Sequence, residues 1–302
     1  MPPHAPPYEL SPTLNVAQNA RTIARDQLAY AQESLERAKN RDKGVYEARK
    51  VFKRLRALLR TVKDHIPPAL YARENAAFRT MAQTLAPLRD GAVMVETLDG
   101  MSNQIEDALF QSVRSVLVAQ HEAMANLFWE GDAVQAVSQQ LSVAQHRARF
   151  WRIHDEGWLT LRDNLARTYA KGVRGLKASQ SAPQDPLILH EWRKRVKHFW
   201  YQLTLLKPLD EATLVPMIAD WNTLGDKLGK AHDLAVLSET CAGFMNAKDY
   251  HALASVLEAT QAELEADALT LGATLYAQPI KPLLKSLRAS YRDFYALQEA
   301  AS

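Results

Sequence analysis

The chain has 302 residues, of which 47% are hydrophobic and 24% charged, a balance typical of a folded globular protein. Glycine is scarce, with 11 residues, and strong helix formers dominate, so the sequence predicts an all-α fold and excludes a sheet protein rich in turn glycines. The formal net charge is only +3, and the single cysteine, Cys241, excludes an internal disulfide.

The N-terminal segment 1–12 carries five prolines and no apolar core. We therefore expect a disordered, proline-rich N-terminus and not a signal peptide. No run of about eighteen residues is free of charge, which argues against a membrane-spanning helix. Together these features predict a cytoplasmic protein that has no contact with a membrane.

Proline pairs and glycines divide the rest of the chain into periodic helical runs. In the first half we predict helices over 13–39, 45–64, 69–86, 89–99, 102–129 and 132–154. In the second half we predict helices over 156–178, 187–207, 211–228, 232–246, 248–270 and 280–298.

Two pairs of segments match each other at nearly one spacing. Segment 46–53 aligns with 190–197 at an offset of 144, and segment 88–93 aligns with 231–236 at an offset of 143. Matches at a consistent spacing indicate an internal repeat. We predict one domain, 13–302, made of two homologous helical repeats, 13–155 and 156–302, that pack against each other.

A basic stripe follows one face of the helix predicted over 45–64. From 41 to 63 there are nine Lys or Arg residues and only two acids, and at 100° per residue Tyr46, Arg49, Lys53, Arg56 and Arg60 share one face. The helix predicted over 187–207 repeats the pattern with His190, Arg193, Lys197 and Tyr201. One such stripe is as typical of a solvated face as of a binding site. Its recurrence favours a site for an extended anion, because Arg and Lys both bind phosphate oxygens.

These segments resemble a known family. LILHEWRKRVKHFWYQLTLL (187–206), GVYEARKVFKRLRALLR (44–60), LGKAHDLAVL (228–237) and LAPLRDGAVMVETL (85–98) look like the signature of the CHAD family, the conserved histidine α-helical domains. The resemblance implies two four-helix-bundle-like repeats with a basic groove or pore between them. It also implies binding of inorganic polyphosphate and association with polyphosphate granules. The sequence offers no obvious nucleophile or metal cage, so we expect no cofactor and no metal. Tyr46 departs from the pattern, because it replaces the histidine that the second half keeps as His190.

The resemblance also implies which residues face the ligand. The expected polyphosphate-binding set is Arg49, Lys53, Arg56, Arg60, His190, Arg193, Lys197 and Tyr201. Further candidates are Arg21, Arg25, Lys50, Arg54, Arg89, Lys171, Arg174, Lys194, His198 and His232. Arg89 and His232 each precede an aspartate, and a reading in which Asp90 and Asp233 simply cap helices explains these pairs equally well.

The sequence therefore favours a non-catalytic protein that binds inorganic polyphosphate, or another polyanion, at cytoplasmic polyphosphate granules. One alternative is an all-α metal-dependent phosphohydrolase acting on polyphosphate or nucleotides, with His190, His232 and Asp233 as the metal-binding residues. Another is a nucleic-acid-binding protein, although only Tyr46 and Tyr201 offer stacking aromatics on the basic stripe.

Overall fold

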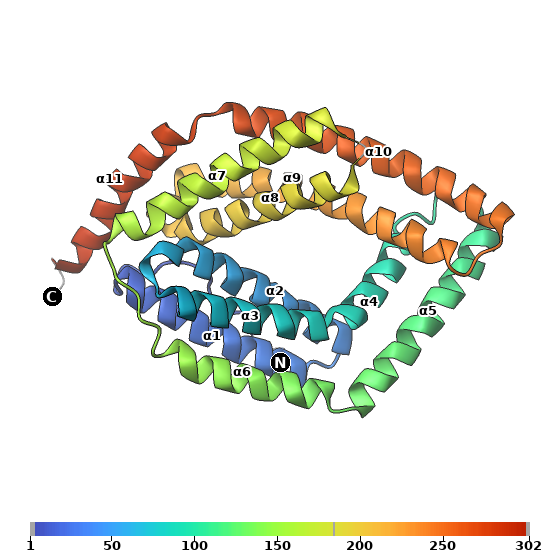
Figure 1. Ribbon diagram of the computed structural model, residues 1–302, viewed down its shortest axis with the longest axis horizontal. Helices are drawn as coiled ribbons and strands as arrows, with labels where there is room; N and C mark the ends of the chain where they lie inside the picture. The colour runs from blue at the N-terminus through green and yellow to red at the C-terminus, as the bar shows by residue number, and fades with distance from the viewer. Residues whose placement is uncertain (1–3, 184, 300–302) are drawn as a thin grey trace.

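The computed structural model describes residues 4–183 and 185–299, and this part of the chain is built from helices alone (Figure 1). The first half contains α1 (Val16–Arg37), α2 (Arg41–Thr61), α3 (Pro68–Thr84), α4 (Ala86–Asp99), α5 (Asp107–Glu130) and α6 (Ala133–Ala148). The second half contains α7 (Trp158–Ser181), α8 (Pro186–Leu206), α9 (Glu211–Ala242), α10 (Ala247–Ala277) and α11 (Ile280–Glu299). Short 3-10 turns, η1 (Lys63–His65) and η2 (Lys207–Leu209), follow α2 and α8. The prediction of an all-α fold is confirmed.

Side-chain caps and prolines explain where the helices begin. Asn15 accepts a hydrogen bond from the Gln18 amide in a capping box before α1, and Asn40 accepts one from the Lys43 amide before α2. Pro68 and Pro186 occupy the first turns of α3 and α8, where the missing N–H has no helical partner to lose.

The two halves of the chain present their helices in corresponding order. The interval from the start of α3 to the start of α9, residues 68 to 211, is 143 residues, and so is the interval from the end of α4 to the end of α9, residues 99 to 242. The helix α9 thus spans the region that α3 and α4 cover in the first half, and the expected division at residue 155 falls in the linker between α6 and α7.

The predicted break between helices at 228 and 232 is wrong, because α9 runs without interruption from Glu211 to Ala242. Gly225 and Gly229 lie inside the helix and have no Cβ, which leaves room for side chains of α8. A Cβ at Gly225 would lie 2.8 Å from Cε of Lys197, and one at Gly229 would lie 3.6 Å from Nη2 of Arg193. The glycines therefore mark close approach of two helices and not a helix end.

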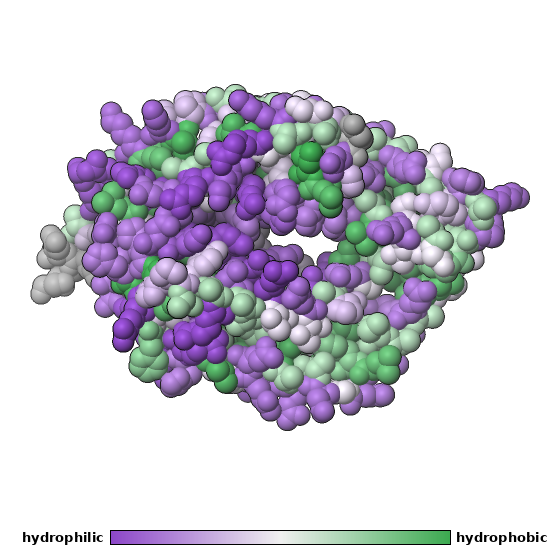
Figure 2. All heavy atoms as spheres, in the orientation of Figure 1, coloured by the Kyte–Doolittle hydropathy of each residue, from purple (hydrophilic) through white to green (hydrophobic). Residues whose placement is uncertain are grey.

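The residues that the structure describes form two separate hydrophobic cores. The larger core joins both halves through α1, α2, α7 and α8, and it buries Phe52, Trp192 and Phe199 completely. The smaller core lies where α4 and α5 meet α9 and α10, and it includes Leu98, Leu117 and Leu237. Between the two cores an opening passes through the molecule, and hydrophilic residues gather above, below and to the left of it (Figure 2).

The expectation of disorder over 1–12 is wrong for residues 4–12, the part of this segment that the structure describes. Tyr8 and Leu10 are buried in the larger core. The Tyr8 hydroxyl donates to the Arg54 carbonyl at 2.9 Å, and the Leu10 amide donates to the Leu205 carbonyl at 3.0 Å. Two apolar side chains and these hydrogen bonds fix a segment whose proline content suggested a flexible chain. Residues 1–3 lie outside the described part.

Candidate functional site

Helices α2, α4, α8 and α9 border the opening (Figure 1). The two basic stripes lie on α2 and α8, which contact each other between the two halves. On α2 the apolar side chains Val51, Phe52 and Leu55 are fully buried, while Lys53 on the opposite side is exposed. The amphipathic pattern of the helix therefore places its cations away from the core.

Lys53 is the centre of a cluster of positive charges from three helices. Although the Lys53 side chain as a whole is exposed, protein closely surrounds its ammonium group. This desolvation, followed by the charges of Arg193, Arg49, Lys197 and Arg89, lowers the pKa of Lys53 to about 8. We call these five residues the central cation cluster. Lys53 has no carboxylate within 4.0 Å among the described residues, and Asp233 is a more distant carboxylate on which its charge acts.

Arg49 and Arg193 occupy equivalent places in the two halves of the central cluster. Arg49 donates to the Ala82 carbonyl at 2.6 Å and lies 3.7 Å from the Asp90 carboxylate. Arg193 lies near Asp233 and Asp226, and burial lowers the pKa of both arginines. The Nε atoms of both arginines are buried without a hydrogen-bond partner in the described structure. Each guanidinium thus keeps one buried N–H donor without a partner.

Asp90 and Asp233 are not helix caps, so that reading of the two aspartates is wrong. Both lie inside helices, α4 and α9 respectively. Burial, and the nearby charge of Asp90, raise the pKa of Asp233, while Arg193, Lys53 and Arg89 oppose that rise. Asp90, 3.7 Å from Arg49, and Asp233, whose charge acts on Arg193, are therefore counter-charges of the two equivalent arginines.

The Lys197 side chain lies against α9 at Gly225, which has no side chain and so leaves space for it. Its Nζ lies 2.8 Å from the Asp226 carboxylate and 4.9 Å from the centre of the Trp200 ring. These contacts fix the ammonium group near Lys53 without burying it. Of the predicted set, Arg49, Lys53, Arg193 and Lys197 are therefore brought together, with Arg89 from the further candidates.

His190 and His232 form a second feature at the edge of this cluster. Their ring centres are 5.0 Å apart, and Nδ1 of His190 is buried without a partner in the residues described. Burial, with the charges of Arg193 and His190, lowers the pKa of His232 to about 4. Burial, with Lys194 and Arg193, also lowers the pKa of His190. Both rings are accordingly neutral at pH 7 in the free protein.

A flanking cluster of four cations, Arg56, Arg60, Lys194 and Arg195, surrounds His198 beyond the central cluster on α2 and α8. Burial and these cations lower the pKa of His198 well below its usual value. Burial also lowers the pKa of Arg60 to about 10, with Arg56 and Arg195 adding to the effect. Arg56 binds the Asn75 side chain at 3.2 Å, and Lys194 and Arg195 both bind Glu191. This cluster continues the positive surface along the two helices.

Tyr201 does not face the opening, and its assignment to the ligand-facing set is wrong. Its side chain is 6% exposed, and its ring contacts those of Tyr8 and Trp200 with centres 6.2 and 4.6 Å apart. Arg54, a further candidate, lies on the same buried side, where it donates to Gln27 at 3.1 Å and covers Tyr8. The N-terminal segment, which covers this side of the helices, is the reason for both errors.

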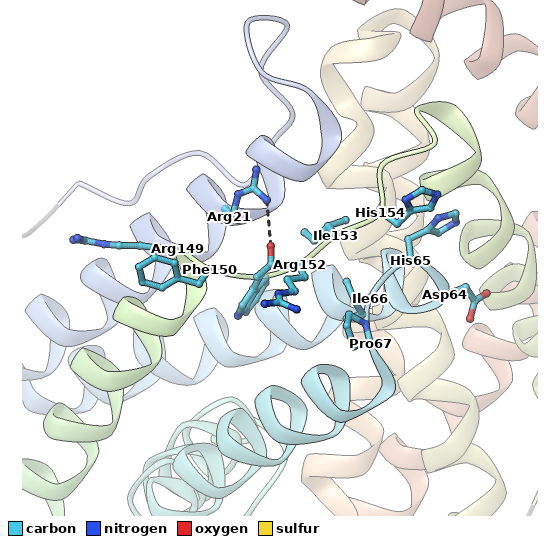
Figure 3. A pocket seen from close by; sticks show the side chains of 11 residues that line it. Arg21, Asp64, His65, Ile66, Pro67, Arg149, Phe150, Arg152, Ile153 and His154 are labelled. Carbon is cyan, nitrogen blue, oxygen red and sulfur yellow. Dashed lines mark hydrogen bonds between the residues drawn. The ribbon is translucent and has the colours of Figure 1, made fainter.

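Arg21 and Arg25 also lie apart from the central cluster. Arg21 donates to the Trp151 carbonyl at 3.1 Å and lines a pocket of about 780 Å³ beside the linker between the two halves (Figure 3). Arg25 lies on α1 beside Asp26. Lys50 is paired with Glu47 at 3.2 Å and lies over the Tyr46 ring, at the margin of the central cluster.

The remaining candidates, Lys171 and Arg174, lie on α7. They share that region with Lys63 and Arg167, and Lys171 is close enough to Arg195 for its charge to act there. Sequence reasoning missed Lys63, Arg167 and Arg195 as part of the basic surface. Lys63 belonged to the basic run 41–63, but at 100° per residue it falls just outside the face that the basic stripe occupies. Only the packing of α7 on α8 and η1 reveals Arg167 and Arg195.

A metal centre at His190, His232 and Asp233 finds no support in the arrangement of side chains. Within residues 4–183 and 185–299, no three His, Cys, Asp or Glu side chains are grouped closely enough to hold a metal ion. Asp233 lies close to Arg193, which competes for its carboxylate. None of the described helices is long and apolar enough to cross a membrane.

Comparison with known proteins agrees with the resemblance seen in the sequence. The family model for the CHAD domain matches residues 21–242. The structure of the CHAD domain from the plant Ricinus communis superimposes with a TM-score of 0.69 at 17% identity, covering 92% of this chain and 97% of that one. PptA from Streptomyces chartreusis superimposes with a TM-score of 0.61 at 13% identity, covering 88% of this chain and 100% of the other. No curated protein matches the sequence.

The match to the family model covers well over half of the chain, and both solved structures share the all-helical fold. The chain belongs to the CHAD domain family.

Proposed function

We propose that this protein binds inorganic polyphosphate without catalysis, in a basic groove formed by α2, α4, α8 and α9, and that it associates with polyphosphate granules. Lys53 carries the proposal, because four further cations from both halves surround it and no carboxylate pairs with it in the described structure. A ligand that carries regularly spaced negative charges would relieve this repulsion.

The chemistry of the cluster suits phosphate oxygens. Arg49 and Arg193 offer guanidinium groups, whose N–H forks fit phosphate oxygens, and Lys53 and Lys197 offer ammonium groups between them. Asp90 and Asp226 pair with Arg49 and Lys197 in the free protein, and Asp233 adds a nearby negative charge. Family membership supports the same ligand, because the resemblance to CHAD proteins implies polyphosphate binding.

The test is a calorimetric titration of the full chain with long-chain polyphosphate at several salt concentrations, with and without magnesium. We expect tight binding that weakens steeply as salt rises, because each phosphate contact displaces counterions. A variant with Lys53→Ala and Lys197→Ala should bind far more weakly. A matched variant with Lys248→Ala and Lys285→Ala removes two exposed charges elsewhere and should bind like the unchanged protein.

Two further measurements separate this proposal from its alternatives. Single-stranded RNA at equal charge concentration should fail to displace polyphosphate, because few aromatic side chains accompany the cations. Displacement by RNA at equal concentration would favour a nucleic-acid-binding protein instead. Release of phosphate that requires a divalent metal would favour the phosphohydrolase. Equal binding by the Lys53, Lys197 variant and the unchanged protein would exclude the proposed groove.

A further inference from the structure

The positive surface does not stop at the flanking cluster. Arg195 on α8 lies close enough to Arg60 and His198 on one side, and to Lys171 on the other, for its charge to act on all three. Arg195 therefore connects the flanking cluster with the cations of α7. Hydrophilic residues likewise extend from the opening over the face between α7 and α3 (Figure 2).

The cations of this region share one side of α7. Arg167, Lys171 and Arg174 are spaced by four and three residues, so they lie on the same face of the helix. Lys63 joins them from η1, which contacts α7 directly. Its Nζ lies 5.1 Å from the centre of the Tyr71 ring. We call Lys63, Arg167, Lys171 and Arg174 the α7 track.

Most of these charges are available to a ligand. All four side chains are exposed. Arg167 binds the Asp64 carboxylate at 2.8 Å. In the part of the chain that the structure describes, Lys63, Lys171 and Arg174 have no carboxylate within 4.0 Å. Like charges on one helix face destabilise the helix slightly, and nothing in the packing of α7 requires them there.

We propose that the α7 track extends the polyphosphate site, so that a chain long enough to leave the central and flanking clusters gains additional contacts on α7. This inference rests on the proposed function and adds to it a preference for long chains. From Arg49 to Arg60 the stripe on α2 covers about 16 Å, and from Arg167 to Arg174 the track adds about 10 Å. A short polyphosphate can occupy the first part alone, whereas a long one can reach both.

The experiment compares inorganic tripolyphosphate with long-chain polyphosphate on the full protein. The variant with Lys171→Ala and Arg174→Ala should lose about tenfold in affinity for the long chain and keep its affinity for tripolyphosphate. The dependence of its affinity for the long chain on salt should also become less steep. For a single-stranded polyanion, the slope of the logarithm of affinity against the logarithm of salt concentration falls by roughly 0.7 per lost phosphate contact. Comparing variant and unchanged protein on the same polymer cancels the statistical advantage of a long chain.

Two controls keep the outcomes distinct. The variant with Lys248→Ala and Lys285→Ala should bind both ligands like the unchanged protein, and melting curves of all variants should agree because every altered side chain is exposed. Equal losses for both ligands, or no loss for the long chain, would overturn the track while leaving the central site intact. Failure of the unchanged protein to bind either ligand would instead overturn the proposed function, and the track with it.

Discussion

The ring of His190 lies 5.0 Å from the ring of His232, and the first half of the chain places a permanent cation at the corresponding position. Tyr46 and Arg89 stand 144 and 143 residues before the two histidines, and the Arg89 guanidinium lies 5.0 Å from the centre of the Tyr46 ring. One pair thus carries a charge at every physiological pH, while the other gains charge only on protonation. The two ends of the central cluster respond differently to acid.

The first prediction concerns how the affinity for polyphosphate depends on pH. Burial and the neighbouring Lys194 and Arg193 lower the pKa of His190, and a bound anion would raise it again. Binding should therefore take up protons, and affinity should rise as pH falls from about 7 to 5. Titrations across this range check the slope. His190→Gln should flatten it, and Tyr46→His should steepen it by adding a second titrating ring.

An unchanged slope in His190→Gln, together with a lower melting temperature, would contradict the first prediction. In that outcome His190 is a structural residue that stays neutral, and it would leave the ligand-facing set. His232 and His198 also titrate on this surface, so His232→Gln and His198→Gln serve as the comparison variants.

The second prediction concerns the stability of the ligand-free protein. Stability should fall at low pH, whereas affinity should rise. The pKa of His232 is about 4 in the folded protein, below the value of about 6.5 expected for the unfolded chain. Between these values the unfolded state binds a proton that the folded state does not, so the free energy of unfolding should fall as pH drops from about 6.5 to 4. Thermal melting across this range measures the effect, and His232→Gln should reduce the pH dependence.

The third prediction separates binding from folding at the two equivalent arginines. Arg49→Ala with Arg193→Ala should lower polyphosphate affinity on the order of a hundredfold, because two charge-assisted contacts are lost. The loss of the hydrogen bond from Arg49 to the Ala82 carbonyl should cost only about 1 kcal/mol of stability.

A matched control for the arginines is Arg37→Ala with Arg114→Ala, which removes two arginines that are each paired with one carboxylate on the surface. This variant should bind normally. A large drop in melting temperature, with affinity falling only in proportion to the unfolded fraction, would mean that Arg49 and Arg193 hold the helices together and do not contact the ligand.

The sequence was sufficient to predict the all-α fold and the basic stripes, because both depend on periodic patterns within single helices. The pattern on α2 places Lys53 opposite the fully buried Val51 and Leu55, and the structure agrees. The break proposed near Gly229 failed for a different reason. A glycine inside a helix and a glycine at its end look alike in sequence, and only the approach of Arg193 and Lys197 distinguishes them.

Contacts between distant segments could not be predicted in the same way. Tyr201 shares the helical face of His190, Arg193 and Lys197, yet the N-terminal segment covers it through Tyr8. The meeting of Arg195 with Lys171 depends on how α7 packs on α8. Helical spacing places a residue on a face, but it does not say which other segment lies against that face.

The fourth prediction tests the new position of Tyr201. Tyr201→Phe keeps the ring in the core, so affinity for polyphosphate should remain unchanged and stability should change little. Tyr201→Ala should destabilise the protein by about 3–5 kcal/mol, the usual cost of removing a buried aromatic ring. Calorimetric titration and chemical denaturation measure the two quantities. A loss of affinity without a loss of stability in Tyr201→Phe would show that the hydroxyl contacts the ligand.

The fifth prediction uses the space that Gly225 leaves for Lys197. A Cβ at residue 225 would lie 2.8 Å from Cε and 2.9 Å from Nζ of Lys197, so Gly225→Ala should displace the ammonium group from the central cluster and from Asp226. The displaced group is the flexible end of a side chain, and alanine favours a helix over glycine by up to about 1 kcal/mol. Affinity should therefore fall severalfold, to the level of Lys197→Ala, while the melting temperature stays the same or rises. Adding Gly225→Ala to Lys197→Ala should produce no further loss of affinity, since the group that the new methyl displaces is already absent. An additive loss in the double variant would show that residue 225 affects binding by moving α9 itself.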